Sequence, residues 1–470
     1  MVEATGSPHP HEDGTNSRTH EFASMYGLTP KVEVAIRDAV RYEQWQRLRM
    51  LMDPLHPADK ADFLERISAE NLRIVVSELG PEFDAEILPY LHEEVREDVR
   101  ELLDPNVLAA SLPELDSDDV VTIAEELEPE KLDEILSALP DQERVLVQQS
   151  LAYPEDSAGR MMQREMVIVP PFWTVGQTID FLRSSQLDRE EFYLIMVIDV
   201  SGHPIGEVRL NKLLCTQRPR RIVEIMETEI RSIPVTMDQE EVALLFRRYG
   251  MVTSGVIDEE GRLVGIITLD DIIDVIDEEA EEDLMALAGV SDASIRTSVL
   301  ETLQGRMPWL FVNLFTAVIA SVVIGFFEST IEKIVALAVL MPIVASMGGN
   351  AGTQTVTIAV RAIAMREFSP KVAVTFGLRE LYVGLANGLI FAVVTAGLSY
   401  VWFGDAQIAI VLGIAMLVNM VVASISGTLI PLALVKTGID PAIASSVFIT
   451  TITDVIGFLV FLGLAAFYLL

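Results

Sequence analysis

Cysteine is nearly absent from the chain. Cys215 is the single cysteine among 470 residues, which excludes a disulfide-stabilised scaffold and a zinc centre built on several thiolates. Basic side chains are also scarce, with 34 lysines and arginines against 70 aspartates and glutamates and a formal net charge of −36. Because contacts to phosphates need clustered positive charge, a nucleic-acid-binding protein is not expected.

Several catalytic motifs are missing as well. The sequence has no phosphate-binding loop, which argues against an ATP-driven pump, and no HExxH or GxSxG motif or phosphorylatable aspartate motif. We therefore do not expect an enzyme. Residues 1–24 lack the apolar stretch of a secretory signal peptide. They are rich in Ser, Thr, Gly, His and Pro, and we expect a disordered tail.

The charge is divided unevenly along the chain. Residues 301–470 carry only eight acidic and seven basic side chains, so nearly all of the negative charge precedes them. Apolar stretches in this region reach the roughly 20 residues that cross a bilayer. We expect an all-α membrane domain over 305–470, with spans at about 307–327, 333–360, 372–402, 406–434 and 442–470.

The loops between these spans predict the orientation. Basic residues cluster between spans two and three and between spans four and five: Arg361, Arg366, Lys371, Arg379 and Lys436. The other loops are mainly acidic, with Glu328, Glu332 and Asp405. Positively charged loops stay on the cytoplasmic side of a membrane. We therefore expect a protein of the cytoplasmic (inner) membrane whose acidic part lies in the cytoplasm and whose C-terminus lies on the outer side.

The acidic part contains two internal repeats. Within 25–152, the segments Ile67–Leu91 and Leu115–Leu139 match at an offset of 48 residues, each beginning near a capping Ser68 or Ser117. This pattern predicts stacked helical hairpins in a small superhelix.

The second repeat is α+β. Residues 153–218 and 219–280 each contain a short strand, an amphipathic helix, and two strands joined by a glycine turn. The second copy has GRLVGIITLDDI from Gly261 and the first GHPIGEVRLNKL from Gly202. These motifs resemble a pair of cystathionine-β-synthase (CBS) motifs, with the second copy the stronger match.

Asp454 is the most informative residue of the membrane region. It lies about midway along the last apolar span, where a charge is costly and seldom tolerated without a function. Ser446, Thr450 and Gly457 share its helix face, so this stripe is expected to line an ion pathway. The alternative is a structural aspartate that is protonated or hydrogen-bonded.

The segment Met341–Thr357 is rich in helix-weakening residues. Pro342 and three glycines suggest irregular backbone at membrane depth, which is tolerated only where it is buried in protein or lines a cavity. Asn350, Thr353 and Thr355 would add oxygen ligands for a hard cation. Close helix packing through small residues is the alternative.

A run of acids without a base precedes the membrane region: Asp270, Asp271, Asp274, Asp277, Glu278, Glu279, Glu281, Glu282 and Asp283. Like charges at this spacing destabilise a helix, so divalent cations are expected to neutralise them. A solvated acidic surface is the alternative. A connecting helix should follow over 281–304.

Together these features resemble the MgtE family of magnesium channels. The markers are PIVASMGGNAGTQ from Pro342, DDIIDVIDEEAEEDL from Asp270 and ITTITDVIG from Ile449. The resemblance implies a multidomain fold with a helical N domain, a CBS pair, a plug helix and five membrane helices. It also implies a homodimer with a Mg²⁺ pore on its two-fold axis, which cytosolic Mg²⁺ closes.

The resemblance also assigns site residues. In the pore it implies Asp454, Asn350, Gly349, Thr450, Ser446 and Thr353. In the regulatory Mg²⁺ sites it implies Asp238, Glu240, Asp271, Asp274, Glu279, Glu282, Asp283 and either Asp118 or Asp119. The chain departs from the family pattern at Gly250, which replaces an acid, and at Ser446 and Thr353, which replace asparagines.

The sequence leaves two other functions open. An ion-coupled secondary transporter of divalent cations such as Co²⁺ or Mn²⁺ would use Asp454 for its coupling ion, although no inverted repeat is evident. A nucleotide-sensing membrane regulator would hold the ribose of ATP, or of another adenine nucleotide, with Thr268 and Asp271. The first CBS copy has Val208 and Asn211 there, so at most one such site is expected.

Overall fold

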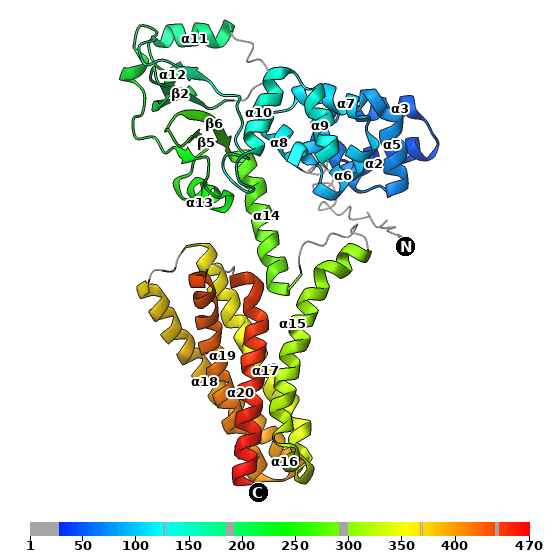
Figure 1. The fold of residues 1–470 in the computed structure, drawn as a ribbon, viewed down its shortest axis with the longest axis vertical. Helices are drawn as coiled ribbons and strands as arrows, with labels where there is room; N and C mark the ends of the chain where they lie inside the picture. The colour runs from blue at the N-terminus through cyan, green and yellow to red at the C-terminus, as the bar shows by residue number, and fades with distance from the viewer. Residues whose placement is uncertain are drawn as a thin grey trace, which may run out of the picture. The chain divides into compact units, whose positions relative to one another are not determined.

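The computed structural model describes residues 28–125, 127, 129–184, 192–290, 299–366, 368, 370–437 and 441–470. The expected N-terminal tail lies outside these residues. The chain forms two compact units that divide between Val275 and Ile276. The predicted fold class is confirmed, with a helical domain and two small sheets in the first unit and long apolar helices in the second (Figure 1).

The N-terminal domain is entirely helical in its described part. Its α-helices are α2 (Pro30–Arg41), α3 (Trp45–Met52), α4 (Pro57–Glu65), α5 (Ala69–Leu79), α6 (Glu93–Leu102), α7 (Pro105–Ser111), α8 (Ser117–Glu125), α9 (Pro129–Ala138) and α10 (Asp141–Leu151). Three 3₁₀ helices join them: η1 (Gly80–Glu82), η2 (Ala85–Tyr90) and η3 (Leu112–Glu114). Proline opens α2, α4, α7 and α9, where its missing N–H costs no hydrogen bond.

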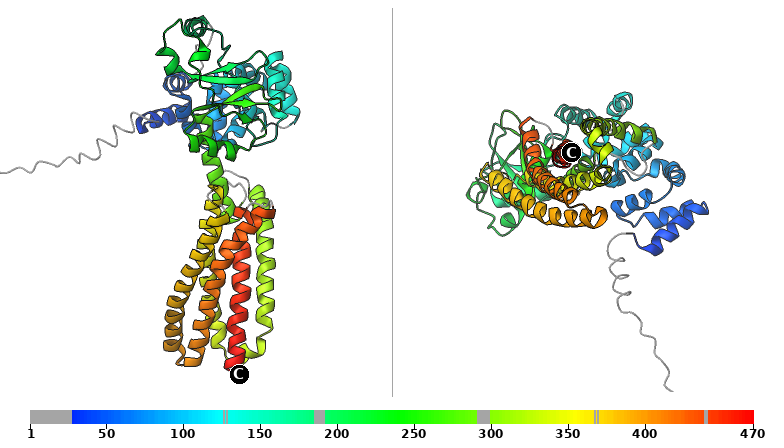
Figure 2. Two further views of the ribbon diagram at one scale, coloured as in Figure 1. Left: turned by 90° about the vertical axis from the view of Figure 1, so that its left-hand side faces the viewer. Right: turned by 90° about the horizontal axis from the view of Figure 1, so that it is seen from below.

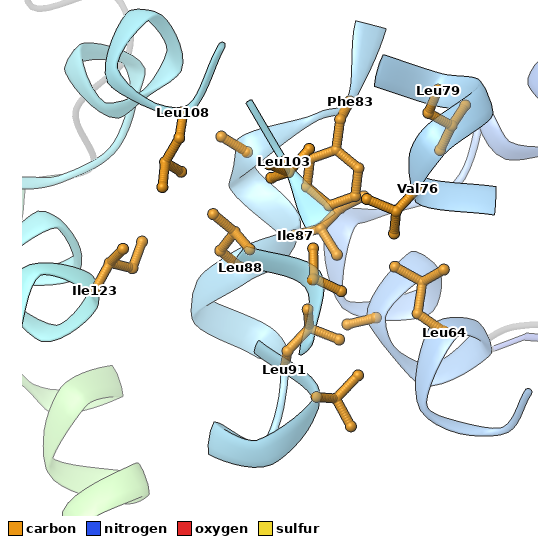
Figure 3. Packing of buried hydrophobic residues seen from close by; sticks show 14 of the residues in the cluster. Leu64, Val76, Leu79, Phe83, Ile87, Leu88, Leu91, Leu103, Leu108 and Ile123 are labelled. Carbon is orange, nitrogen blue, oxygen red and sulfur yellow. The ribbon is translucent and has the colours of Figure 1, made fainter. Parts of the chain in front are cut away.

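The core of this domain is built from leucine, isoleucine, valine and phenylalanine. Leu64, Val76, Ile87 and Leu88 are almost fully buried and point toward one another from α4, α5 and η2 (Figure 3). Each such side chain contributes roughly 1.5–3 kcal/mol through removal from water. The two repeat halves are not identical, because η2 contains Pro89 where the second half forms the regular helix α9.

The two predicted caps differ in outcome. Ser68 caps α5, accepting a hydrogen bond from the Asn71 amide at 3.3 Å, as expected. The prediction for Ser117 was wrong, because Ser117 is the first residue of α8 and its hydroxyl donates to Glu165 Oε2 at 2.7 Å. The Arg164 amide in turn donates to Ser117 Oγ at 2.7 Å. This serine therefore ties α8 to the segment that leads into the CBS pair.

The CBS pair consists of two similar three-stranded sheets. The first sheet has the order β1 (Ile168–Val169), β2 (Leu194–Ile198), β3 (Pro204–Arg209), and the second has β4 (Ile233–Pro234), β5 (Thr253–Ile257), β6 (Leu263–Thr268). In each, the first pair is parallel and the second antiparallel. The accompanying helices are α11 (Val175–Ser184), α12 (Leu210–Leu214), the 3₁₀ helix η4 (Ile222–Glu224), α13 (Gln239–Tyr249) and α14 (Leu269–Ala288).

The glycine common to both CBS copies has a steric cause. A Cβ on Gly206 would lie 2.9 Å from the Glu227 carbonyl oxygen, and one on Gly265 would lie 2.8 Å from the Gln163 carbonyl oxygen. At each position an isolated β-bridge brings another backbone segment against the strand. Only glycine admits so close an approach.

The second unit contains the membrane helices. They are α15 (Val299–Gly325), the short α16 (Glu328–Lys333), α17 (Ala336–Ala364), α18 (Pro370–Phe403), α19 (Ala406–Thr437) and α20 (Pro441–Tyr468). Among the described residues, five of these helices are long and apolar enough to cross a membrane. Helix α19 packs against α17, α18 and α20 and is the most buried span (Figure 2).

The structure corrects two expectations about these helices. Helix α17 continues through Pro342 and the glycines without irregular backbone. Its glycines allow close packing instead, because a Cβ on Gly348 would lie 2.2 Å from Asn419 Nδ2 of α19. Arg361 and Arg379 lie inside helices α17 and α18, and not in the loop that joins them.

The connecting segment is described in part. Helix α14 starts in the CBS pair and ends at Ala288, because Gly289 adopts the left-handed conformation with φ of +69°. Residues 291–298 of the expected connecting helix lie outside the described residues.

Candidate functional site

The end of α14 contacts the helices that carry the predicted pore. Ala286 and Leu287 pack against a buried cluster of Val356 and Val360 on α17 and Ala442 and Ile449 on α20. The contact is apolar, so it depends on shape and on the position of α14 rather than on charge. A displacement of the end of α14 would therefore change its packing against α17 and α20.

Helices α17 and α20 approach closely beside the predicted pore residues. A Cβ on Gly352 would lie 2.3 Å from Ile449 Cγ2, so Gly352 sets the spacing at this level. About one helical turn before Gly352 on α17, the fully buried Asn419 of α19 fills the space between Gly348 of α17 and Gly457 of α20. Asn419 Nδ2 donates to the Val344 carbonyl at 2.9 Å, while its Oδ1 is buried without a partner among the described residues.

The predicted pore side chains point away from the rest of their own chain. Asn350, Thr353 and Thr450 are exposed, and Asp454 is half-buried. Asn350 Nδ2 donates to Ser346 Oγ at 3.4 Å, Thr353 Oγ1 donates to the Gly349 carbonyl at 3.0 Å, and the space beside Gly349 is open.

The Asp454 carboxylate forms neither an ion pair nor a hydrogen bond within the described part of the chain. The side chain of Ser446, which the sequence places on the same helix face, lies outside the described residues. The described members of the set thus form a polar face on α17 and α20 that their own chain leaves uncovered.

A second group of acids gathers in the first unit, where α8 meets the start of α14. Asp118 is 7% exposed, and its Oδ1 has no hydrogen-bond partner among the described atoms. Burial, together with Asp271, Asp119 and Asp116, raises the pKa of Asp118 well above its ordinary value. A buried oxygen without a partner and with three acidic neighbours is suited to a cation.

The pKa values of the neighbouring acids are raised as well. Burial, with Asp116 and Asp271, raises the pKa of Asp119 to about 7, although Arg96 opposes the shift. Burial raises the pKa of Asp271 to about 6, even though the Thr268 hydroxyl donates to its carboxylate at 2.8 Å. The sequence left open whether Asp118 or Asp119 belongs to the site, and the structure brings both to Asp271.

The other predicted regulatory residues lie elsewhere. Asp238 and Glu240 are exposed at the start of α13, where Asp238 Oδ1 accepts from the Glu240 amide at 3.0 Å and caps the helix. Asp274 is exposed on α14 one turn after Asp271, while Glu279, Glu282 and Asp283 follow on α14 within the second unit. Among the described residues, no three His, Cys, Asp or Glu side chains already converge as metal ligands.

Gly250 has a structural role that explains one departure from the family pattern. It ends α13 in the left-handed conformation, with φ of +60° and ψ of 44°. Glycine adopts this conformation without strain, whereas a longer side chain such as that of glutamate would be strained at this helix end.

Three residues of the structure were not predicted from the sequence. Asp116 has a pKa raised by burial and by Glu165, and it belongs with the acids at α8. Asn419 gave no signal because a neutral side chain in an apolar helix does not stand out. Glu380, 5% exposed on α18, carried the same signal as Asp454, a lone acid in an apolar span, and was overlooked.

Three family models match the N-terminal domain, the second CBS copy and the membrane helices of this chain. A family model described as "Divalent cation transporter" matches residues 341–464, "MgtE intracellular N domain" matches 55–156, and "CBS domain" matches 222–278. The magnesium transporter MgtE of Bacillus subtilis is 34% identical over 334 residues, which cover 71% of this chain and 74% of the relative. This chain belongs to the MgtE family of magnesium transporters.

A second MgtE relative agrees. The magnesium transporter MgtE of Thermus thermophilus is 34% identical over 330 residues, 70% of this chain and 73% of the relative. The cytosolic domain of the Mg²⁺ channel MgtE, solved in complex with ATP, is 32% identical and covers 52% of this chain and 99% of that one, with a TM-score of 0.49. Transport of Mg²⁺ across a membrane is the activity that fits this family.

Proposed function

We propose that this chain forms a homodimeric Mg²⁺ channel whose pore lies between two copies of the α17–α20 face. The polar face of these helices supports the proposal, because Thr450, Asn350 and Thr353 are exposed in the single chain and Asp454 is only half-buried. Two facing Asp454 carboxylates would neutralise one divalent ion. Mg²⁺ loses its water reluctantly, so the neutral oxygens would contact its hydration shell.

Uptake into liposomes tests this pore. We expect purified wild-type protein to admit Mg²⁺ at low internal Mg²⁺, and Asp454→Ala to abolish the influx. Asp405→Asn, which removes a carboxylate outside the helices, is the matched control and should behave as wild type. Full influx through Asp454→Ala would place the pore elsewhere.

We further propose that cytosolic Mg²⁺ closes the channel through the acids at α8 and α14. Asp118, Asp119 and Asp271 repel one another while buried, so a bound cation stabilises the arrangement in which they meet. Water-mediated contacts allow Mg²⁺ to bind without prior convergence of three carboxylates. Exposed Asp238, Glu240 and Asp274, and Glu279, Glu282 and Asp283 along α14, would supply further contacts.

The continuity of α14 gives a route from the sensor to the pore. This 20-residue helix begins beside Asp271 and ends at the residues that pack on α17 and α20. Mg²⁺ that favours one position of the α14 start would therefore favour one spacing of the pore helices. Closure is then a population shift driven by tighter Mg²⁺ binding to the closed state.

The membrane orientation is part of the proposal. The basic residues near the α17–α18 connection and Lys436 would face the cytoplasm, together with the N-terminal domain and the CBS pair. The channel would then mediate Mg²⁺ influx through the cytoplasmic membrane, with the C-terminus outside.

A nucleotide site in the second CBS copy is the secondary candidate. The Thr268 hydroxyl donates to Asp271 and also contacts Asp270, so a hydroxyl and a carboxylate lie together at the start of α14. Such a pair can hold a ribose. Because Asp271 also belongs to the acidic cluster, an adenine nucleotide and Mg²⁺ would influence each other's binding.

A further inference from the structure

The membrane unit contains a buried acid that the pore does not use. Glu380 is 5% exposed on α18, and the Thr355 hydroxyl of α17 donates to its Oε2 at 3.2 Å. Within the described part of the chain, no lysine, arginine or histidine forms an ion pair with it. A carboxyl group buried in this way either carries a proton or, when it is ionised, is balanced by a bound cation.

Glu380 lines a cavity of about 190 Å³ between α17, α18 and α19. Four neutral side chains with oxygen atoms share the wall: Gln354, Thr355, Asn387 and Ser424. Gly384 lets α18 approach α19 closely at this wall, because a Cβ there would lie 2.3 Å from Ser424 Oγ. A water molecule occupies about 30 Å³ in the liquid, so the cavity has room for an ion and part of its hydration shell.

The cavity is separate from the predicted pore face. Successive residues of a helix are about 100° apart, so Thr355 lies on nearly the opposite side of α17 from Thr353. Thr355 is 4% exposed, whereas Thr353 is exposed. The cavity thus lies within one subunit, on the side of α17 away from Asn350 and Thr353.

The net charge of the side chains that line the cavity indicates the class of ion. The wall supplies one carboxylate, while the single basic lining residue, Arg379, is exposed. One buried negative charge balances one positive charge, and a divalent ion would leave an uncompensated charge in a medium of low dielectric constant. A proton would need none of the four neutral oxygens, whereas an alkali cation requires them.

We propose that the Glu380 cavity binds a monovalent alkali cation, with Glu380 as the charged ligand and the amide and hydroxyl oxygens of α17, α18 and α19 around it. The site is independent of the proposed pore, and a chain that conducts no Mg²⁺ would still contain it. A bound ion would hold three membrane helices together.

Binding of ²²Na⁺ to the full-length protein in detergent, measured by scintillation proximity, tests the proposal. We expect saturable binding of one ion per chain, a loss of affinity of at least about tenfold in Glu380→Gln, and unchanged binding in Asp405→Asn and Asp454→Asn. Excess K⁺ or Li⁺ should displace the label, whereas equimolar Mg²⁺ should not.

Gel filtration identifies variants that fail to fold. If Glu380→Gln aggregates, Asn387→Leu serves instead, with weaker affinity expected at the same capacity. Absence of saturable binding in folded wild type, as expected if only a proton occupies the cavity, would overturn the proposal. So would unchanged binding in folded Glu380→Gln, displacement by equimolar Mg²⁺, or loss in Asp454→Asn alone.

Discussion

The two units of the molecule use carboxylates in opposite ways. The first unit holds most of the 70 acidic residues, and at α8 and α14 several of them repel one another at close range. Within α17, α18, α19 and α20 acids are few, and Glu380 and Asp454 each lie in a helix that contains no other acid. The acids of the first unit therefore act on one another, whereas we propose that each membrane acid acts at a site of its own.

This difference predicts how the two regions respond to substitution. Removing one acid from a repelling group relieves strain and weakens cation binding by degrees. Removing the single acid of a membrane site removes all of its negative charge. Charged side chains are costly at that depth, so no neighbouring acid is present to take its place. The following predictions, from the largest expected effect to the smallest, test this contrast.

Removal of two sensor acids should uncouple the regions. We expect Asp271→Ala with Asp274→Ala to keep the channel active at high internal Mg²⁺, with a flux at least about tenfold above wild type under those conditions. Glu259→Ala with Glu260→Ala, which removes two acids from an exposed hairpin, is the control. Normal inhibition of the first double variant would refute the sensing role of this group.

The spacing of α17 and α20 should depend on one glycine and not on its neighbour. In Gly352→Ala the new Cβ meets Ile449 at 2.3 Å, whereas the space beside Gly349 is open. We expect Gly352→Ala to lower stability by about 1–3 kcal/mol and to reduce Mg²⁺ uptake, because overpacking forces the helices apart. Gly349→Ala should remain as stable as wild type, and equal effects of the two changes would contradict the packing seen here.

The acidic cluster should make the first unit sensitive to pH when Mg²⁺ is absent. Folding raises the pKa of Asp119 to about 7 and of Asp271 to about 6, so the folded state holds these protons more tightly than the unfolded state. Stability is therefore present at low pH and is lost as the pH rises through this range, by about 1–2 kcal/mol between pH 6 and pH 8.

Hydrogen exchange of the α8 amides in full-length protein with a chelator measures this loss. Protection should fall between pH 6 and pH 8 after correction for the intrinsic exchange rate, and Mg²⁺ should restore it most at pH 8. Asp119→Asn should flatten the dependence. A pH-independent wild type would show that these acids are not buried together.

The smallest effect concerns the second CBS copy. Thr268→Ala should weaken binding of a labelled ATP analogue to full-length protein by roughly three- to tenfold, the value of one hydrogen bond. Asn211→Ala in the first copy, which lacks the threonine, should leave binding unchanged. Equal binding by wild type and Thr268→Ala would remove the nucleotide proposal.

The sequence was most informative where one residue type has one physical meaning. Repeats, apolar spans and the glycines of the CBS hairpins predicted the domain types and the five membrane helices. Ser68 caps its helix as expected, since its hydroxyl accepts from the Asn71 amide. Ser117 lies one residue after the position equivalent to Ser68, and its hydroxyl donates to Glu165, which is 48 residues away in the chain.

The remaining misses arose from tertiary packing. Pro342 and the glycines of α17 suggested a broken helix, but neighbouring helices fill the space beside Gly348 and Gly352 and keep α17 regular. Asp118 is one of many acids in the sequence, and only its burial without a partner distinguishes it. Gly250 stands where the family pattern has an acid, and its left-handed conformation adds that this glycine ends α13.

Mg²⁺ influx into liposomes at low and at high internal Mg²⁺ tests the central claim most directly, with three proteins compared in the same lipid. We expect wild type to conduct only at low internal Mg²⁺, Asp454→Ala at neither concentration, and Asp271→Ala with Asp274→Ala at both. Influx through Asp454→Ala that still closes at high Mg²⁺ would contradict the account, because the sensor would then act on a path that does not contain Asp454.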